Sequence, residues 1–141
     1  MASACAFCAI VAGELPAYPV LADDHSLAFL DHRPLLPGHC LLVPRQHYAA
    51  LEDLPAAQVG PLFANVQRLA LAVERGLEAD GSFVAINVRV SQSVPHLHVH
   101  VVPRRRGDGL FGRVLIWKRQ PYPDEATITR LQHAIRAALA A

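Results

Sequence analysis

The sequence of 141 residues lacks any apolar run of the roughly 20 residues that a membrane-spanning helix needs. It also lacks an excess of charge, because 13 basic and 12 acidic residues leave a formal net charge of +1. A scaffold that binds nucleic acid is usually far more basic. We therefore expect neither a membrane nor a specific nucleic-acid partner, and the apolar content of 52% is typical of an ordinary soluble protein.

Cysteine is scarce as well. Only three cysteines are present, and an odd number does not suit a disulfide framework. The first residues show neither the charged segment nor the long apolar stretch of a signal peptide. Both observations favour a cytoplasmic location. Cys40 lies in an apolar run, where we expect it to pack as a small hydrophobic side chain.

No internal repeat, low-complexity tract or linker divides the chain, so its length predicts a single domain over residues 1–141. Apolar residues at three- and four-residue spacing predict a long amphipathic helix over residues 55–77 and a shorter one from residue 124 or 127 to the C-terminus. Turn residues separate five stretches that read as strands, at residues 18–21, 26–31, 39–44, 82–89 and 96–103. This order indicates an α+β domain with a mainly antiparallel sheet.

Residues 96–102 read His-Leu-His-Val-His-Val-Val. The period of two predicts a strand that points its three histidines to a solvent-facing side and its apolar residues to a buried side. Histidine is a poor choice for a plain exposed strand, but its imidazole can attack an electrophile, move protons or bind a metal at neutral pH. The pattern therefore indicates a functional site in preference to a polar strand face that happens to be rich in histidine.

Two kinds of enzyme chemistry suit these histidines. In the first, a neutral imidazole whose Nδ1–H is held by a backbone carbonyl attacks phosphorus through Nε2, while a neighbouring imidazole holds or donates a proton. Donors for the phosphoryl oxygens are available just upstream, from Asn87, Arg89, Ser91, Gln92 and Ser93. In the second, a histidine-bound zinc ion activates a water molecule. Positions i, i+2 and i+4 are spread too widely for all three histidines to reach one metal easily.

Cys5 and Cys8 form a Cys-x-x-Cys pair, which by itself fits a zinc site, a redox pair or two buried thiols. The βαβ pattern that accompanies a thioredoxin-like redox pair is missing. Zinc requires two further ligands to complete a tetrahedron. Spacing alone does not choose among the candidates, which are His25, His32, His39, His47 and the triad histidines.

Residues 96–102 resemble the His-φ-His-φ-His-φ-φ motif of the histidine triad (HIT) superfamily of nucleotide hydrolases and transferases, in which φ is a hydrophobic residue. Further stretches look like zinc-containing bacterial-type members of that family, in the same order: Cys-Ala-Phe-Cys at 5–8, Ile-Val-Ala-Gly-Glu-Leu-Pro at 10–16, Leu-Ala-Phe-Leu-Asp at 27–31, Pro-Gly-His-Cys-Leu-Leu-Val-Pro at 37–44, and Ser-Gln-Ser at 91–93. The resemblance covers roughly residues 5–106, whereas members differ most in the tail, here residues 107–141. It implies a HIT-like fold with a five-stranded sheet that continues across a homodimer.

The resemblance also implies individual roles. His98 resembles the nucleophile that accepts the nucleotidyl group, and His100 the partner that contacts the scissile phosphate and the leaving group. His39 resembles a fourth histidine behind the triad, and Gln92 and Ser93 resemble phosphate and leaving-group contacts. The implied nucleotide-binding residues are Asp31 for the ribose hydroxyls, Asn87 for a phosphate, and Phe7, Ile10, Phe29 and Leu30 for the base.

For the metal, the resemblance implies a structural zinc site made of Cys5, Cys8, His47 and His96. The implied activity is cleavage of a phosphoanhydride or phosphoramidate bond of a purine nucleotide, such as an adenosine nucleotide, through a covalent intermediate on His98. A dinucleoside polyphosphate or a nucleoside phosphoramidate is the expected substrate. The alternatives are a purine-nucleotide-binding protein without catalysis and a zinc-water hydrolase.

Overall fold

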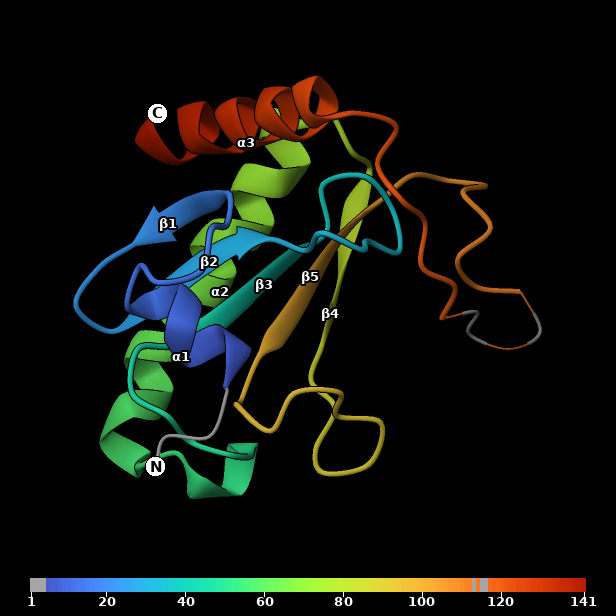
Figure 1. Cartoon of the computed structure of the whole chain (residues 1–141). Coiled ribbons are helices and arrows are strands. Elements are labelled where there is room, and N and C mark those ends of the chain that lie inside the picture. Colours follow the sequence, from blue (N-terminus) through green and yellow to red (C-terminus); the bar gives the residue numbers. More distant parts are fainter. Residues whose placement is uncertain (1–4, 113, 115–116) are drawn as a thin grey trace.

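The structure is a computed structural model that describes residues 5–112, 114 and 117–141 (Figure 1). No helix in these parts of the chain is long and apolar enough to cross a membrane. In chain order the elements are α1 (Ala6–Val11), β1 (Pro19–Ala22), β2 (Ser26–Leu30), β3 (Cys40–Pro44), the 3-10 helix η1 (Leu51–Asp53), α2 (Ala56–Gly76), β4 (Gly81–Ala85), β5 (Val99–Arg104) and α3 (Glu125–Ala140).

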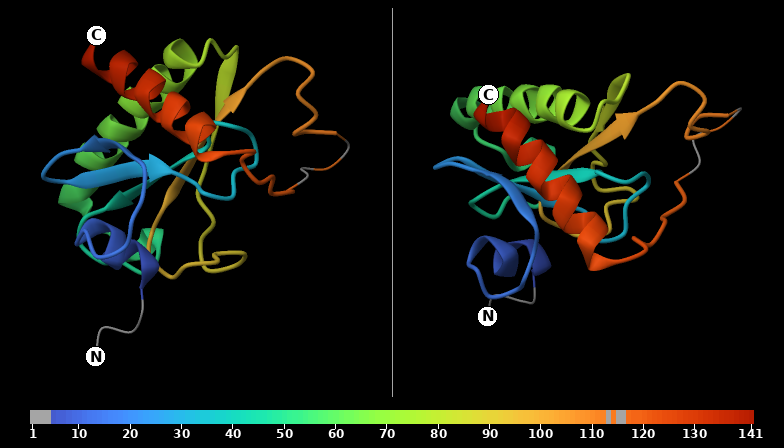
Figure 2. Two further views of the ribbon diagram at one scale, coloured as in Figure 1. Left: turned by 45° about the horizontal axis from the view of Figure 1, so that its top comes forward. Right: turned by 90° about the horizontal axis from the view of Figure 1, so that it is seen from above.

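The five strands form one sheet in the order β1-β2-β3-β5-β4, and every neighbouring pair is antiparallel. Helix α2 covers one face, α3 crosses over α2 beside β1, and the short α1 lies on the opposite face (Figure 2). The predicted α+β class and antiparallel sheet are therefore confirmed. The two helices predicted from periodicity are present, whereas α1 and η1 were not predicted.

Long apolar side chains of α2 recur at the spacing of one helical stripe and form the main core with the sheet. Strands β2 and β3 are buried along their whole length, because helices cover both faces of the sheet. This explains why their sequences are nearly continuous apolar runs without alternation. The buried stripe of α2 consists of Leu62, Val66, Leu69 and Val73.

The triad segment differs from the prediction in two respects. β5 begins at Val99, so that His96 and His98 precede the hydrogen-bonded ladder. The histidine side is also buried, with at most 3% of any triad side chain exposed. Phe7 of α1 packs edge-on against His96 and His98, and Trp117 packs against His100. The solvent-facing prediction was wrong because α1 and the C-terminal tail cover this side of the sheet.

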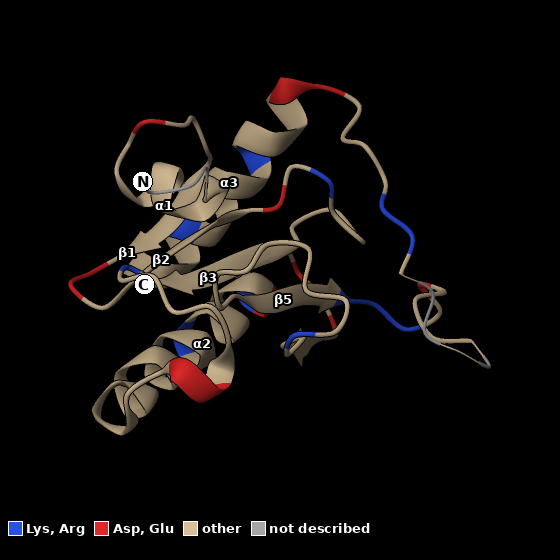
Figure 3. Cartoon of the chain, turned by 60° about the horizontal axis from the view of Figure 1, so that its bottom comes forward, with Lys and Arg blue, Asp and Glu red and all other residues tan. Residues whose placement is uncertain are grey.

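Acidic and basic residues are distributed over several elements (Figure 3). The run of three arginines at 104–106 begins at the last residue of β5. Arg104 pairs with Asp108 at 2.7 Å across the turn that follows, and the Arg105 guanidinium donates to the backbone oxygen of Leu77 at the end of α2. Two of the three arginines are therefore used in contacts within the fold.

Candidate functional site

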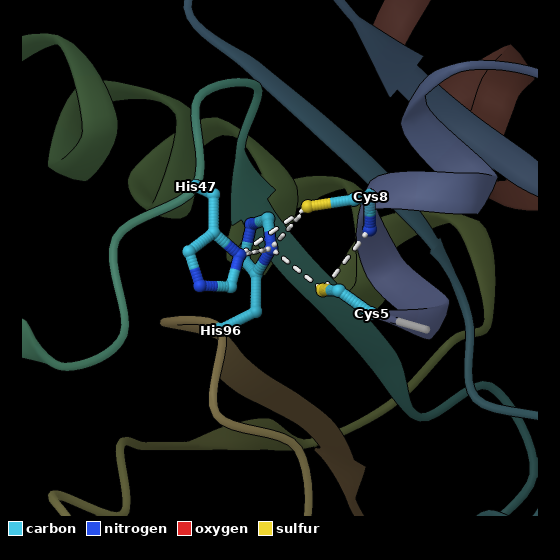
Figure 4. A group of neighbouring side chains, drawn as sticks. All are labelled: Cys5, Cys8, His47 and His96. Atoms are coloured by element: carbon cyan, nitrogen blue, oxygen red, sulfur yellow. Dashed lines mark hydrogen bonds between the residues drawn. The ribbon is translucent and has the colours of Figure 1, made fainter. Parts of the chain in front are cut away.

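Four metal-ligating side chains meet beside the start of the triad segment (Figure 4). Cys5 caps the N-terminus of α1 and Cys8 lies in its first turn, while His47 follows β3 and His96 opens the triad. The His96 Nδ1 atom lies 3.4 Å from Sγ of Cys5, 3.5 Å from Sγ of Cys8 and 3.2 Å from Nδ1 of His47. Bonds of about 2.0 Å to nitrogen and 2.3 Å to sulfur around a tetrahedral centre place neighbouring ligand atoms about 3.3–3.8 Å apart. The cluster therefore has the size of a zinc site.

The protonation of the cluster also suits a cation. His96 Nε2 lies 3.1 Å from the backbone oxygen of Pro44 and can only donate to it, so Nδ1 keeps its lone pair toward the thiols. Burial and the neighbouring Cys5 raise the pKa of Cys8 to about 11, which makes a bare thiolate unfavourable there. A dication supplies the opposite charge that stabilises thiolates. Two sulfur and two imidazole donors are a ligand set that zinc prefers, so these residues fit the metal.

His98 is fixed by the residue that precedes it in the triad. Its Nδ1 lies 2.7 Å from the backbone oxygen of His96, to which it donates, so Nε2 carries the free lone pair. Burial lowers the pKa of the imidazole, although the hydrogen bond to His96 opposes this effect. The ring therefore remains a neutral base, and its geometry is that of a positioned nucleophile.

The hydrogen bonds of His39 and His100 fix which ring nitrogen of each residue carries the proton. The backbone N–H of Leu35 donates to Nδ1 of His39 at 3.0 Å, so the proton of neutral His39 must be on Nε2. That proton is donated to Nδ1 of His100 at 2.9 Å, which leaves the proton of His100 on Nε2. Among the residues that the structure describes, the buried Nε2 of His100 has no hydrogen-bond partner. It is an N–H donor available to a bound molecule.

Asp31 lies near the same ring nitrogen of His39 that contacts His100. One of its oxygens lies 3.8 Å from His39 Nε2. The possible metal-ligand atoms of Asp31, His39 and His100 all lie within 4.8 Å of one another. A metal at this position would need the lone pair of His39 Nε2, which the contact with Leu35 commits to a proton. The group is therefore better suited to holding protons than to binding a second metal.

A pocket of about 840 Å³ opens onto these histidines. Its walls contain His98, His100, Asp31 and Ser93, together with all four apolar residues predicted to hold a base: Phe7, Ile10, Phe29 and Leu30. The apolar part is well formed, because Phe7 packs edge-on against Phe29 with ring centroids 5.5 Å apart. A flat apolar ring and a polar, phosphorylated end would both find matching surfaces here.

Two predicted contacts lie outside the pocket walls. The amide of Gln92 donates to the backbone oxygen of Ala49 at 2.5 Å and accepts from the N–H of Arg89 at 2.8 Å, so it braces the loop before the triad. Arg89 and Ser91 have φ angles of 66° and 61°, and this left-handed backbone bends the loop sharply. Asn87 likewise does not line the pocket, and neither does His39, which lies behind the pocket residues His100 and Asp31.

Sequence reasoning gave no site role to the tail, yet the tail contributes two residues. The ring of Trp117 meets that of His100 edge-on, with centroids 4.9 Å apart. The guanidinium of Arg119 donates to Asp31 and lines the pocket. No periodicity or motif marks these two positions, because only the path of the chain after β5 brings them to the histidines.

The fold is an α+β domain whose antiparallel sheet carries a buried histidine triad beside a pocket, and comparison with known proteins gives its family. The chain belongs to the HIT domain family, whose model matches residues 12–107. An uncharacterized HIT-like protein of Mycobacterium tuberculosis is 40% identical over 134 residues, which cover 93% of this chain and 92% of the relative. The resemblance inferred from the motifs is thereby confirmed.

A solved structure and a relative of named activity extend the comparison. The crystal structure of a zinc-bound histidine triad family protein from Mycobacterium smegmatis superposes with a TM-score of 0.84 at 41% identity, covering 97% of this chain and 94% of that chain. The adenosine 5'-monophosphoramidase of Saccharomyces cerevisiae is 32% identical over 122 residues, which cover 84% of this chain and 72% of the relative.

The buried histidines predict a loss of stability in acid. Burial lowers the pKa of His39 and of His100 to about 3 from the ordinary value of 6.5. Below pH 6.5 the unfolded chain binds these protons while the folded protein does not until about pH 3, so the free energy of unfolding decreases as the pH falls through this window. Urea unfolding at pH 7 and pH 5 should show less of this decrease in His39→Gln. The exposed His133→Gln serves as the control; an unchanged pH dependence in His39→Gln would contradict the assignment.

Proposed function

We propose that the protein is a nucleotide hydrolase or transferase that cleaves a phosphoanhydride or phosphoramidate bond of a purine nucleotide through a nucleotidyl-His98 intermediate. The observation that carries the proposal is that the neighbouring rings of His98 and His100 have complementary protonation; their centroids are 5.0 Å apart. His98 presents a lone pair on Nε2, while His100 presents an N–H on Nε2, and both residues line one pocket. One is suited to attack phosphorus and the other to hydrogen-bond the group that leaves.

The reaction divides into two displacements. First, His98 Nε2 forms a bond to phosphorus as the bond from phosphorus to the leaving group breaks; the positive charge that develops on the ring is stabilised by the backbone oxygen of His96. His100 Nε2–H donates a hydrogen bond to the leaving atom; an amine leaves after taking one proton from solvent, whereas a phosphate leaves as the anion. Water then attacks phosphorus and releases one proton to solvent, the bond from phosphorus to His98 Nε2 breaks, and His98 returns to its neutral form with release of the nucleoside monophosphate.

The pocket supports a nucleotide as the substrate. We assign Asp31 to the ribose hydroxyls, because an ionised carboxylate accepts hydrogen bonds from two neighbouring hydroxyls. We assign the apolar wall of Phe7 and Phe29 to the base and the hydroxyl of Ser93 to a phosphoryl oxygen, which is supported by the position of all three residues on one pocket. The named activity of the yeast relative favours an adenosine phosphoramidate as the substrate to test first. A dinucleoside polyphosphate is the second.

We further propose a closed, structural zinc at Cys5, Cys8, His47 and His96. The four-ligand geometry supports it, and so does the zinc-bound mycobacterial structure. When bound, zinc would supply a fixed charge that holds the thiolates and ties α1 to the triad. His96 then has two functions, since its ring belongs to the cluster and its backbone oxygen holds His98. The metal would thus orient the nucleophile without touching the substrate.

We also propose that the protein forms a homodimer. Strand β4 is an edge strand, with no partner on its outer side among the described residues, and it exposes Val84. Val59 and Phe63 are exposed one turn apart on α2, beside its buried stripe. An edge strand together with exposed apolar side chains on a helix makes a surface that a second copy can cover. This supports pairing through α2 and the β4 edge.

The covalent mechanism predicts that His98→Ala loses turnover of adenosine phosphoramidate by at least about 10³-fold, because the variant cannot form the intermediate. Binding of AMP, measured by calorimetry, should change only a few-fold. Mass spectrometry of the quenched wild-type reaction should show a protein adduct of one nucleoside monophosphate, absent from His98→Ala. The exposed His133→Ala is the matched control, and substantial turnover by His98→Ala would refute the mechanism.

The structural zinc predicts one equivalent of the metal per chain in elemental analysis of the protein. Cys5→Ser combined with Cys8→Ser should lose that zinc and melt at a lower temperature, since metal binding contributes to the free energy of folding. Cys40→Ala removes a buried thiol outside the cluster and should retain the metal. Full zinc content in the double variant would exclude this ligand set.

The proposed dimer predicts that Phe63→Glu sediments as a monomer at concentrations where the wild type sediments as a dimer, because a carboxylate would have to be buried at the interface. Ala64→Glu places the same charge on the next residue of α2, which points away from Phe63, and should leave the dimer intact. A dimeric Phe63→Glu protein would place the interface elsewhere.

A further inference from the structure

We propose that Arg119 is a positioning residue of the nucleotide site, which pairs with the carboxylate of Asp31, holds it in one orientation and thereby makes the pocket selective for a ribonucleotide. This inference rests on the proposed function, in which Asp31 binds the ribose hydroxyls. The matched HIT domain ends at residue 107, so Arg119 lies in the tail beyond it. It is therefore a contribution of this chain's own tail to the site.

Asp31 has only 4% of its side chain exposed, and its two oxygens have different partners. Oδ1 accepts the backbone N–H of Arg33 at 3.0 Å. Oδ2 accepts from Nη1 of Arg119, which also donates to the backbone oxygen of Arg33. The guanidinium thus bridges the carboxylate to the backbone two residues further along the chain. The N–H of Arg33 and the guanidinium of Arg119 thus hold one oxygen each and together fix the orientation of the carboxylate.

Arg119 is the permanent cation that Asp31 needs. The other basic groups within 4.0 Å of its oxygens, among the described residues, are the imidazoles of His39 and His32. His39 is neutral with its proton directed at His100, and the side chain of His32 is 83% exposed. A buried carboxylate without an opposite charge becomes protonated or turns toward water. Either change would spoil an acceptor for two hydroxyls.

The ion pair leaves room for the sugar. An ionised carboxylate offers about four acceptor positions, two on each oxygen. The N–H of Arg33 and the guanidinium of Arg119 occupy one position on each oxygen of Asp31. One position on each oxygen stays available, which matches the two neighbouring hydroxyls of a ribose. Arg119 can therefore remain in place while the nucleotide binds.

Arg119 is itself held firmly by its own segment, residues 117–122, which we call the strap. The backbone N–H of Gln120 donates to the oxygen of Pro34 at 2.7 Å, and the N–H of Gly38 donates to the hydroxyl of Tyr122 at 3.2 Å. Trp117 packs against His100 at the other end. After Arg119 the strap is thus hydrogen-bonded to Pro34 and Gly38, which follow Asp31, and before Arg119 it packs against His100 through Trp117. These contacts hold the backbone that carries the guanidinium in place.

The test compares two substrates that differ only in the sugar, adenosine 5'-phosphoramidate and its 2',3'-dideoxy analogue. The wild type should prefer the ribose substrate in kcat/KM by at least about tenfold, because a missing hydroxyl leaves buried acceptors unpaired. Arg119→Met should lose roughly tenfold with the ribose substrate, mostly in KM, and less than about twofold with the dideoxy substrate. Arg119→Lys, which keeps a cation, should retain part of the preference.

Two further substitutions, Lys118→Met and Asp31→Asn, serve as controls. Lys118→Met removes the same charge from the neighbouring, exposed position of the strap and should change neither substrate. Asp31→Asn should reproduce the loss of ribose preference, and adding Arg119→Met to it should cost little more, because both residues act on the same hydroxyls. Circular dichroism spectra should be alike for all variants.

The outcomes separate this inference from the proposed function. An equal loss with both substrates in Arg119→Met would mean that Arg119 contacts the phosphate directly, and no loss would mean that it has no part in the site; either result overturns the inference alone. If the wild type binds AMP without turnover, the ribose preference of the wild type and the variants is measured as the ratio of their affinities for AMP and dideoxy-AMP. A wild type that neither binds nor cleaves either nucleotide would overturn both proposals.

Discussion

His39, His96 and His98 each have one ring nitrogen hydrogen-bonded to a backbone group, and that hydrogen bond decides what the other nitrogen can do. The oxygen of Pro44 accepts a hydrogen bond from His96 Nε2 and leaves Nδ1 with a lone pair for a metal, whereas the oxygen of His96 accepts from His98 Nδ1 and leaves Nε2 as a base. Leu35 fixes His39 in the opposite sense and so gives His100 a donor. The same side chain therefore has three different capabilities within a few residues, because the backbone around each ring differs.

This arrangement couples the metal cluster to the reactive end of the pocket through His96, which takes part in both. Helix α1 provides a second link, since Phe7 lies between the two cysteines of the cluster and packs against His98 with ring centroids 5.0 Å apart. A change that displaces α1 would remove one wall of the pocket and the cover of His98 together. The N-terminal segment thus packs against the pocket and the metal-ligating cluster through the same helix.

The sequence predicted the local structure better than the environment of the site. Alternation placed Leu97 and Val101 on the α2 side correctly, because a strand has only two faces, but it could not show that α1 and Trp117 cover the other. A six-residue helix has too little periodicity to be recognised. Ligand spacing alone left the third and fourth metal ligands open, whereas the family motif selected His47 and His96, which the fold brings together with Cys5 and Cys8. The role of Arg119 could not be predicted from the sequence, because its partner Asp31 lies 88 residues away along the chain.

Burial also explains how the site can be made of histidines and still act as a base. A protonated imidazole binds phosphate more strongly than a neutral one, but it has no lone pair with which to attack. Burial lowers the pKa of His98, and the charge of Arg119 acts in the same direction. The cation that pairs with Asp31 therefore also favours the uncharged form of His98. A site that put its positive charge on the histidines would gain affinity for phosphate and lose the nucleophile, whereas a guanidinium held outside the triad avoids that conflict.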